Sequence, residues 1–245
     1  MDAGYLNEVA NHPAVRPHIG CAGMGALDYT AALANPNLHA IAVEHGAFLF
    51  DPLDHGRYEL HTFLLPEGRG AGVLPAAAEA FRLMFVETDC TELVTKVAGS
   101  NRPADLMARR AGFSLLFERA GAWEDGSDLR FFGLTIDAWL TRDEALAAEG
   151  HAFHRTLEAA KAVASSHLPA HPDDLAHDRA AGAASLMAKR GNPAKALWLY
   201  NRWARLAGYQ TIQLLSSAPP TFDIGDAVLT FRNGNMEILK CRVEP

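Results

Sequence analysis

The stretch LPEGRGAGVL, residues 65–74, decides the fold because it sets three glycines between two segments of different hydrophobic period. Upstream, residues 38–65 are runs of β-forming residues interrupted by the turn sequences EHG and DHG, which predicts an antiparallel meander. Downstream, residues 71–87 carry apolar side chains at helical spacing. The stretch is therefore predicted to connect a strand to a helix.

The glycines of this connection suggest a chemical use for it. Gly68, Gly70 and Gly72 have no Cβ, so their main chain permits the close approach of a ligand. The helix that follows presents unpaired N–H groups and the positive end of its dipole. We expect a diphosphate to fit this loop, while an ordinary tight connection between a strand and a helix is the alternative explanation of the same glycines.

A second strand and helix follow the first pair. Residues 91–98 read as a strand, and residues 101–111 read as a helix that Gly112 ends. Two further strands, 113–119 and 129–136, flank the turn sequence WEDGSD. A strand, a helix and a strand with short connections form a βαβ unit, so this part of the chain is predicted to mix helices and strands in one layered fold.

The sequence NRPADLMARRAGF, residues 101–113, has Asn at its start, Ala three positions later, Met six positions later and Gly-Phe at its end. Together with the glycine loop, it resembles the coenzyme A loop and the following helix of the GNAT N-acetyltransferase superfamily. The resemblance covers about residues 5–140. It implies an α/β (α+β) fold, with a GNAT-like mixed central sheet and flanking helices, followed by a small C-terminal extension of helices and a β-hairpin.

The resemblance also implies a ternary-complex mechanism. Acetyl-coenzyme A (acetyl-CoA) would lie in a splayed gap between the fourth and fifth strands, where an amine attacks its thioester directly. The main chain of Phe63, Leu64 and Leu65 would hold the pantetheine, and Asn101 would contact the cofactor arm. The amides that would hold the diphosphate are those of Gly68, Arg69, Gly70, Ala71, Gly72 and Val73.

Two positions depart from the family pattern. The family loop usually begins with Gln or Arg, whereas this chain has Glu67, an anion beside the proposed diphosphate, for which Arg69 would compensate. The family's usual general acid is a tyrosine seven residues after the Asn, whereas this chain has Ala108, which has no proton to donate. Relatives without that tyrosine are expected to release a thiolate, so the departure weakens the expectation of catalysis without removing it.

Acetyl transfer also needs a base, because only the neutral form of an amine is a nucleophile. Glu59 and His61 lie two residues apart on the predicted strand before the loop, so they share one face of it close to the expected thioester. We predict that one of them is the catalytic base. The alternatives are a solvated Glu59, a hydrogen-bonded core His61, and a route assisted by the substrate or relayed by water.

Composition changes after Trp139, where the chain becomes rich in alanine. We predict three parts: an acetyl-CoA-binding domain over residues 1–140, a helical linker over 141–174, and a small α+β domain over 175–245. The last part should contain two helices, short strands and a hairpin. Asn192-Pro193 predicts the start of a helix, Gly208 its end, and Asn233-Gly234 the hairpin turn.

Composition and cysteine content favour a soluble cytoplasmic protein. Apolar residues make up 49% of the chain, and no apolar run reaches the roughly 18 residues that span a membrane. The first residues have neither the basic nor the apolar region of a secretory signal. The 3 cysteines are far apart and the histidines form no ligand pattern, so we predict no disulfide framework and no metal site.

Charge is distributed unevenly along the chain. The first 150 residues contain 11 Lys/Arg and 21 Asp/Glu, which favours a cationic small-molecule or protein amine as acceptor. Residues 179–222 contain six Lys/Arg and no Asp or Glu, and we expect this C-terminal part to dock on a protein partner or a second copy. Nucleic-acid binding is disfavoured, because the net charge is −7 and no nucleic-acid-binding motif is present.

The leading prediction is an acetyl-CoA-dependent N-acetyltransferase (an acyltransferase) with an unassigned amine acceptor. Residues 11–20 and 58–70 also resemble GNAT-like proteins encoded by tailed bacteriophages. The alternative is therefore a catalytically inactive GNAT-fold virion or assembly protein, located in the host cytoplasm or the virion. Glu67 and Ala108 favour this alternative, whereas the glycine loop and Asn101 favour the enzyme.

Overall fold

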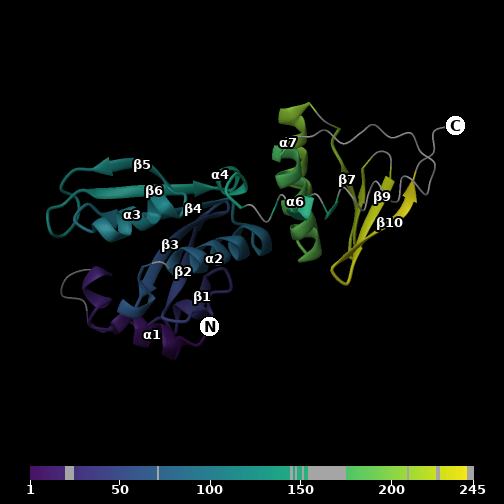
Figure 1. The fold of residues 1–245 in the computed structure, drawn as a ribbon. Helices are drawn as coiled ribbons and strands as arrows, with labels where there is room; N and C mark the ends of the chain where they lie inside the picture. Colours follow the sequence, from purple (N-terminus) through teal and green to yellow (C-terminus); the bar gives the residue numbers. More distant parts are fainter. Residues whose placement is uncertain are drawn as a thin grey trace. The chain divides into compact units, whose positions relative to one another are not determined.

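A computed structural model describes residues 1–19, 25–70, 72–143, 146, 148–150, 152–153, 175–208, 210–224 and 227–241 (Figure 1). The chain divides into two compact units. The first unit comprises Met1–Phe85 and Cys90–Ile136, and the second comprises Val86–Asp89 and Asp137–Pro245. Most of the predicted linker, residues 141–174, lies outside the described residues, so the prediction of a helical linker stays a prediction.

A six-stranded mixed sheet forms the centre of the first unit, with the strand order β1-β2-β3-β4-β6-β5. Its strands are β1 (His39–Val43), β2 (Gly46–Asp54), β3 (Arg57–Leu64), β4 (Glu92–Ala98), β5 (Ser114–Arg119) and β6 (Leu129–Thr135). Only the β3–β4 pair is parallel. The predicted fold class, a mixed central sheet with flanking helices, is confirmed.

The predicted meander forms β1, β2 and β3, and its turns occur at the predicted sequences. His55 and Gly56 join β2 to β3 with positive φ angles of 42° and 79°. Gly56 adopts its angle without steric cost, because glycine has no Cβ. Gly46 begins β2 at φ 156°, and a Cβ there would lie 2.1 Å from the main-chain oxygen of Phe63. The close approach of these two strands therefore requires glycine at position 46.

Four helices and three 3₁₀ turns belong to the described part of residues 1–140. The helices are α1 (Ala3–Asn11), α2 (Val73–Glu87), α3 (Arg102–Arg110) and α4 (Ile136–Leu140), and the turns are η1 (Arg16–His18), η2 (Ala32–Ala34) and η3 (Pro66–Gly68). Helices α2 and α3 match the predicted helices. Helix α1 was not predicted; the Asp2 side chain caps it by accepting a hydrogen bond from the Gly4 N–H.

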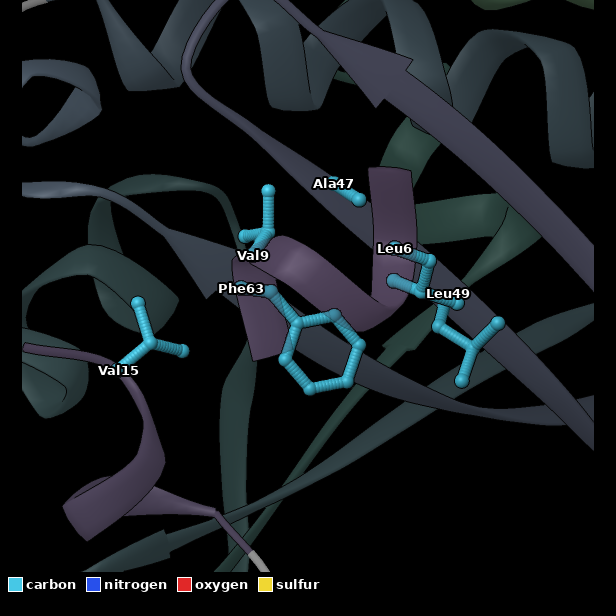
Figure 2. Packing of buried hydrophobic residues seen from close by; sticks show 6 residues of the cluster. All are labelled: Leu6, Val9, Val15, Ala47, Leu49 and Phe63. Atoms are coloured by element: carbon cyan, nitrogen blue, oxygen red, sulfur yellow. The ribbon is translucent and has the colours of Figure 1, made fainter. Parts of the chain in front are cut away.

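Helix α1 packs on β2 and β3 through a cluster of side chains that are at most 3% exposed (Figure 2). The cluster consists of Leu6, Val9, Val15, Ala47, Leu49 and Phe63. Beside it, the Tyr5 hydroxyl donates to the carbonyl of Val43 at 3.0 Å and accepts from the Gly46 N–H at 3.1 Å. These contacts fix α1 against the turn between β1 and β2.

The second unit contains two helices, α6 (Leu175–Lys189) and α7 (Pro193–Ala207), and an antiparallel sheet of the order β10-β9-β8-β7. Its strands are β7 (Gln213–Ser217), β8 (Pro220–Asp223), β9 (Ala227–Arg232) and β10 (Asn235–Cys241). The predicted hairpin is confirmed: Asn233 and Gly234 join β9 to β10 with φ angles of 51° and 75°. The short strand β8 was not predicted.

The limits of α7 agree with the sequence, but its capping does not. Pro193 is the first residue of the helix, and Gly208 follows its last residue at φ 76°. The side chain of Asn192 makes no capping hydrogen bond and donates instead to the carbonyls of Val86 and Thr88, at 3.4 and 3.0 Å. Asn192 therefore stands at the predicted N-cap position, but its side-chain amide is used in these contacts within the second unit and not in a capping bond.

Candidate functional site

Strands β3 and β4 part from each other beside the glycine loop. They pair at three positions: Arg57 with Glu92, Tyr58 with Leu93, and Glu59 with Val94. Beyond these pairs β3 continues to Leu64 and β4 to Ala98 without further pairing between them. Directly after the last pair, the Thr95 hydroxyl donates to the carbonyl of Leu60 at 3.0 Å. Past this contact the two strands make no further main-chain pairs, which leaves a gap between them.

The position of the gap within the sheet corrects one expectation. It lies between the third and fourth strands of the described sheet and not between the fourth and fifth. The reason is that residues 3–11 form α1, and the first described strand begins at His39. Glu59 and His61 therefore belong to the third strand.

The main chain of β3 faces the gap at alternate residues. The carbonyl of Leu60 points toward β4, since it accepts the Thr95 hydroxyl, so Thr62 and Leu64 also direct their main chain that way. Phe63 instead directs its carbonyl toward Gly46 of β2. Of the residues predicted to bind pantetheine, Leu64 therefore directs its main chain toward the gap. Thr62, which was not predicted, does the same.

The loop after β3 begins with a tight turn that uses several of its own amides. The Leu65 N–H donates to the carbonyl of His45 at 3.0 Å. Within η3, the Gly68 N–H donates to Leu65 at 3.0 Å and the Arg69 N–H to Pro66 at 3.3 Å. These three amides are occupied by the protein, so they are poorer candidates for holding a diphosphate than the rest of the loop.

The three glycines of the loop differ in what surrounds them and in their backbone angles. A Cβ on Gly68 would lie 2.7 Å from the carbonyl oxygen of His45, so tight packing explains this glycine. Gly70 has a φ of 102°, which disfavours any other residue. A Cβ on Gly70 or Gly72 would meet no atom within 4 Å. Tight packing therefore explains Gly68, whereas the surroundings of Gly70 and Gly72 have the open space that a ligand-binding loop requires.

The amides of Gly70 and Gly72 have no hydrogen-bond partner within the described residues. The next amide, that of Val73, makes a long bond of 3.4 Å to the carbonyl of Gly70. Helix α2 starts at Val73, so the N–H groups of its first turn add to this open donor set. Ala71, the remaining predicted loop residue, lies outside the described residues.

The charged residues of the loop have different surroundings. The Arg69 guanidinium donates to two main-chain carbonyls, that of Leu64 at 3.2 Å and that of Ala14 at 2.6 Å. Arg69 therefore ties the loop to the segment after α1 and adds positive charge there. Glu67 is exposed on η3, where water solvates its carboxylate.

Glu59 and His61 lie together, as predicted, and a third residue joins them. Oε2 of Glu59 accepts a hydrogen bond from Nζ of Lys96 at 2.8 Å, and Oε1 lies 4.0 Å from Nε2 of His61. The Glu59 side chain is 12% exposed, whereas those of His61 and Lys96 are 40% and 44% exposed. Sequence reasoning missed Lys96, although it lies two residues beyond the partner of Glu59 in β4.

The surroundings of His61 favour its neutral form. Burial lowers the pKa of His61, and the positive charge of Lys96 lowers it further, against the opposing effect of the Glu59 and Asp51 carboxylates. A neutral imidazole is the form that accepts a proton. The ring of His61 is also stacked with that of Phe63, with ring centroids 6.5 Å apart, which limits its orientation.

Asn101 caps helix α3. Its side-chain oxygen accepts a hydrogen bond from the Ala104 N–H at 3.2 Å. The side-chain amide nitrogen of Asn101 has no partner within the described residues, so one donor remains for a ligand. Ala108, on the same helix, is 6% exposed.

Aromatic side chains lie beside the cluster, on the same face of the sheet. Lys96 pairs with Phe131 of β6, and Phe131 pairs with Phe117 of β5. The rings of Phe131 and Phe117 stack with centroids 4.3 Å apart, and the Arg119 guanidinium lies over both rings. Phe117 is 46% exposed, so this face is open to solvent there.

Within the part of the chain that the structure describes, no three His, Cys, Asp or Glu side chains lie close enough to hold a metal ion. Cys90 is buried and in no disulfide, and its thiol donates to the carbonyl of Glu92 at 3.7 Å. No helix among the described residues is long and apolar enough to cross a membrane.

The basic residues of the second unit are largely paired with acceptors. Lys189 contacts Glu149, Arg190 contacts Glu87, and Arg202 contacts Asp137. The Lys195 ammonium is buried and donates to the carbonyl of Thr88 at 2.9 Å. Four of the six basic residues of the acid-free sequence are thus held by acceptors among the described residues.

The fold is similar to that of solved structures. Two variants of the spermidine N-acetyltransferase SpeG from Vibrio cholerae are similar, each with a TM-score of 0.50, 16% identity, and coverage of 59% of this chain and 95% of that one. The same enzyme in complex with CoA and spermine has a TM-score of 0.49 and 14% identity, covering 57% and 92%. No protein-family model and no curated protein matches the sequence. The chain therefore contains the fold of the GNAT acetyltransferases.

Proposed function

We propose that the first unit binds acetyl-CoA and transfers its acetyl group to an amine. The observation that carries this proposal is the parting of β3 and β4 directly before a loop with open amides at Gly70 and Gly72. The parting offers unpaired main-chain groups to an elongated ligand, and the loop with the start of α2 offers donors to a diphosphate. The residues present therefore fit the proposed cofactor.

Each part of the site has a proposed task. The main chain of Thr62 and the N–H of Leu64 hold the pantetheine, since the Leu64 carbonyl already accepts from Arg69. The Asn101 side-chain amide adds a donor. The amides of Gly70, Gly72 and the first turn of α2 bind the diphosphate, with Arg69 as a nearby cation. Bound acetyl-CoA supplies a thioester for attack by the amine.

The cluster of Glu59, His61 and Lys96 on β3 and β4 carries out the proton transfer. His61 accepts the proton of the incoming ammonium, because its lowered pKa keeps the imidazole neutral. Glu59 then stabilises the imidazolium, and Lys96 holds the Glu59 carboxylate in place. Ala108 provides no acid, so the sulfur leaves as a thiolate or takes its proton from water.

Isothermal titration calorimetry with CoA and acetyl-CoA tests the proposal, followed by a thiol-release assay with a panel of amines. Spermidine, the substrate named for the structural neighbours, and a neutral amine of similar length are the first pair to compare. The acidic first half of the chain favours the cationic amine. Absence of binding at millimolar acetyl-CoA would refute the proposal.

The alternative is a GNAT-fold structural or assembly protein without catalysis, such as a phage virion component. The specific observations in its favour are the buried Ala108 at the family's acid position and the occupied amides of Gly68 and Arg69. On this alternative the C-terminal part contacts a partner. Helix α7 exposes Leu206 to 80% and Trp198 to 42%, with Arg202 over the Trp198 ring.

A further inference from the structure

We propose that β5 is a self-association strand, through which two copies of the chain join their central sheets in antiparallel fashion. This inference concerns assembly and does not depend on the proposed acetyl transfer. It rests on the open edge of β5, on the apolar side chains that this edge exposes, and on the distribution of charge along the strand.

Strand β5 is the last strand of the sheet. It pairs with β6 on one side, and no strand of the described residues pairs with it on the other. The outer side of β5 therefore presents main-chain N–H and C=O groups that another strand can pair with. An edge of this kind is normally protected by charge, by proline or by a covering element.

The exposed side chains of β5 are apolar. All six residues of the strand are exposed, and Leu115, Leu116 and Phe117 are 38%, 51% and 46% exposed. The strand contains neither lysine nor proline. Soluble monomers rarely leave three consecutive large apolar residues uncovered on a free edge, so this surface points to a partner.

The apolar surface extends over both faces of the sheet. Leu115 lies opposite Phe132 of β6, and Phe117 lies opposite Phe131. Phe131 and Phe132 are consecutive in β6, so they and their partners point to opposite faces. A small ligand would cover one face, whereas an added strand covers both faces and pairs the edge as well. A strand is therefore the better occupant.

The other edge of the same sheet shows the contrast. In β1, Ala40 packs against the buried cluster beneath α1, together with Leu38 just before the strand. The strand's exposed residue is the small Ala42. Within the central sheet, the exposed large apolar side chains thus lie on the β5 edge and not on the β1 edge. The edge strands of the second unit, β7 and β10, each expose one leucine, Leu215 and Leu239, whereas β5 exposes three consecutive apolar residues.

The order of residues in β5 favours a second copy of the same strand. The sequence SLLFER is apolar in the middle and charged at its end. An antiparallel pair centred on Leu116 and Phe117 sets the charged end of one strand beside the Ser114 end of the other, so like charges stay apart. A parallel pair would set Glu118 against Glu118, which is unfavourable.

The two charges at the end of β5 already have contacts in their own chain. Glu118 accepts a hydrogen bond from Arg130 at 2.7 Å, and Arg119 lies over the rings of Phe117 and Phe131. Neither charge needs an ionic partner from another molecule. The pairing with β6 is irregular at Leu116, and such bulges discourage edge pairing, so the apolar side chains carry more of the inference than the regularity of the edge.

Sedimentation velocity of the full-length chain over a range of micromolar concentrations tests this inference. We expect the wild type to sediment with twice the mass of the chain, and Leu115→Glu and Leu116→Glu to sediment as monomers. Leu53→Glu is the matched control, because Leu53 is 47% exposed on β2, away from this edge, and should leave the dimer intact. Leu206→Glu tests whether self-association runs through α7 and not through β5.

Amide hydrogen exchange of the unmutated chain provides a second measurement, in case a variant fails to fold. We expect the amides of residues 114–119 to exchange more slowly as the protein concentration rises. A monomeric wild type, or folded Leu115→Glu and Leu116→Glu variants that remain dimeric, would overturn the inference. Dissociation by Leu206→Glu alone would assign self-association to α7 instead.

Discussion

Nζ of Lys96 lies 2.8 Å from Oε2 of Glu59, and this ion pair joins β4 to β3 where their main-chain pairing ends. The same carboxylate faces His61 through its other oxygen. A lysine, a glutamate and a histidine from two strands thus form one cluster at the entrance of the parting. Their order suggests that Lys96 acts on His61 both directly and through Glu59.

Replacing Lys96 should therefore change the pH dependence of the reaction. Burial lowers the pKa of His61 most, and Lys96 adds to this effect against Glu59 and Asp51, so Lys96→Met should raise that pKa. The acidic limb of the profile of kcat/KM against pH should move to higher pH. Lys189→Met, which removes a lysine paired with Glu149 in the second unit, is the control. An unmoved limb in Lys96→Met would argue against His61 as the base.

His61→Ala should lower the rate of acetyl transfer by about 100-fold at neutral pH, the usual effect of losing a general base. It should leave acetyl-CoA binding unchanged in calorimetry, since no loop contact is lost. Stability gives a second readout. Because the pKa of His61 is lower in the folded than in the unfolded state, wild-type stability should fall as the pH drops below the ordinary histidine value of about 6.5, and this dependence should weaken in the variant.

The loop glycines allow packing and ligand binding to be separated. Gly72→Ala should keep the wild-type melting temperature, because its Cβ meets no atom within 4 Å, but should weaken CoA binding if the main chain touches the diphosphate. Gly68→Ala should lower the melting temperature, because its Cβ would lie 2.7 Å from the His45 carbonyl oxygen. Thermal melts and calorimetry on both variants check this. Equal CoA affinity of Gly72→Ala and wild type would count against the diphosphate site.

Asn101 offers a similar separation of capping from ligand binding. Asn101→Ala removes the acceptor that caps α3 and should cost about 1 kcal/mol of stability. Asn101→Asp keeps an acceptor for the Ala104 N–H but loses the side-chain donor, so it should fold normally and bind acetyl-CoA more weakly. Chemical denaturation and calorimetry distinguish the two effects. If Asn101→Asp binds acetyl-CoA as tightly as the wild type does, Asn101 has a structural role alone.

Gly46→Ala tests the packing of the meander independently of the site. The new Cβ would lie 2.1 Å from the carbonyl oxygen of Phe63, so β2 and β3 must move apart. We expect a loss of about 3 kcal/mol, toward the upper end of overpacking effects. Urea denaturation measures it, with Gly72→Ala as the control glycine. A loss below about 1 kcal/mol, the lower end of overpacking effects, would contradict the observed strand spacing.

The sequence predicted the elements whose signals are local. The turn at His55-Gly56, the glycine loop before α2, the Asn101 helix and the Asn233-Gly234 hairpin all occur where their residue types require them. Helix α1 had a local signal too, an Asp2 cap before apolar residues at Leu6, Val9 and Ala10, but it was not recognised. These successes depend on turn and cap chemistry within a few residues.

The features that were missed depend on which strands become neighbours. Lys96 joins Glu59 through the register of two strands that are far apart in the sequence, and no local pattern encodes that register. The main-chain direction of Thr62 depends on the same pairing.

The parting of β3 and β4 divides the central sheet into two antiparallel blocks of three strands, β1-β2-β3 and β4-β6-β5. Within each block the neighbouring strands pair with each other, whereas only three residue pairs join β3 to β4 at the seam between the blocks. A molecule lying in that seam would supply to both blocks the hydrogen bonds that they do not give each other. Its departure would then loosen the whole sheet, so the rigidity of the unit should report whether the seam is filled.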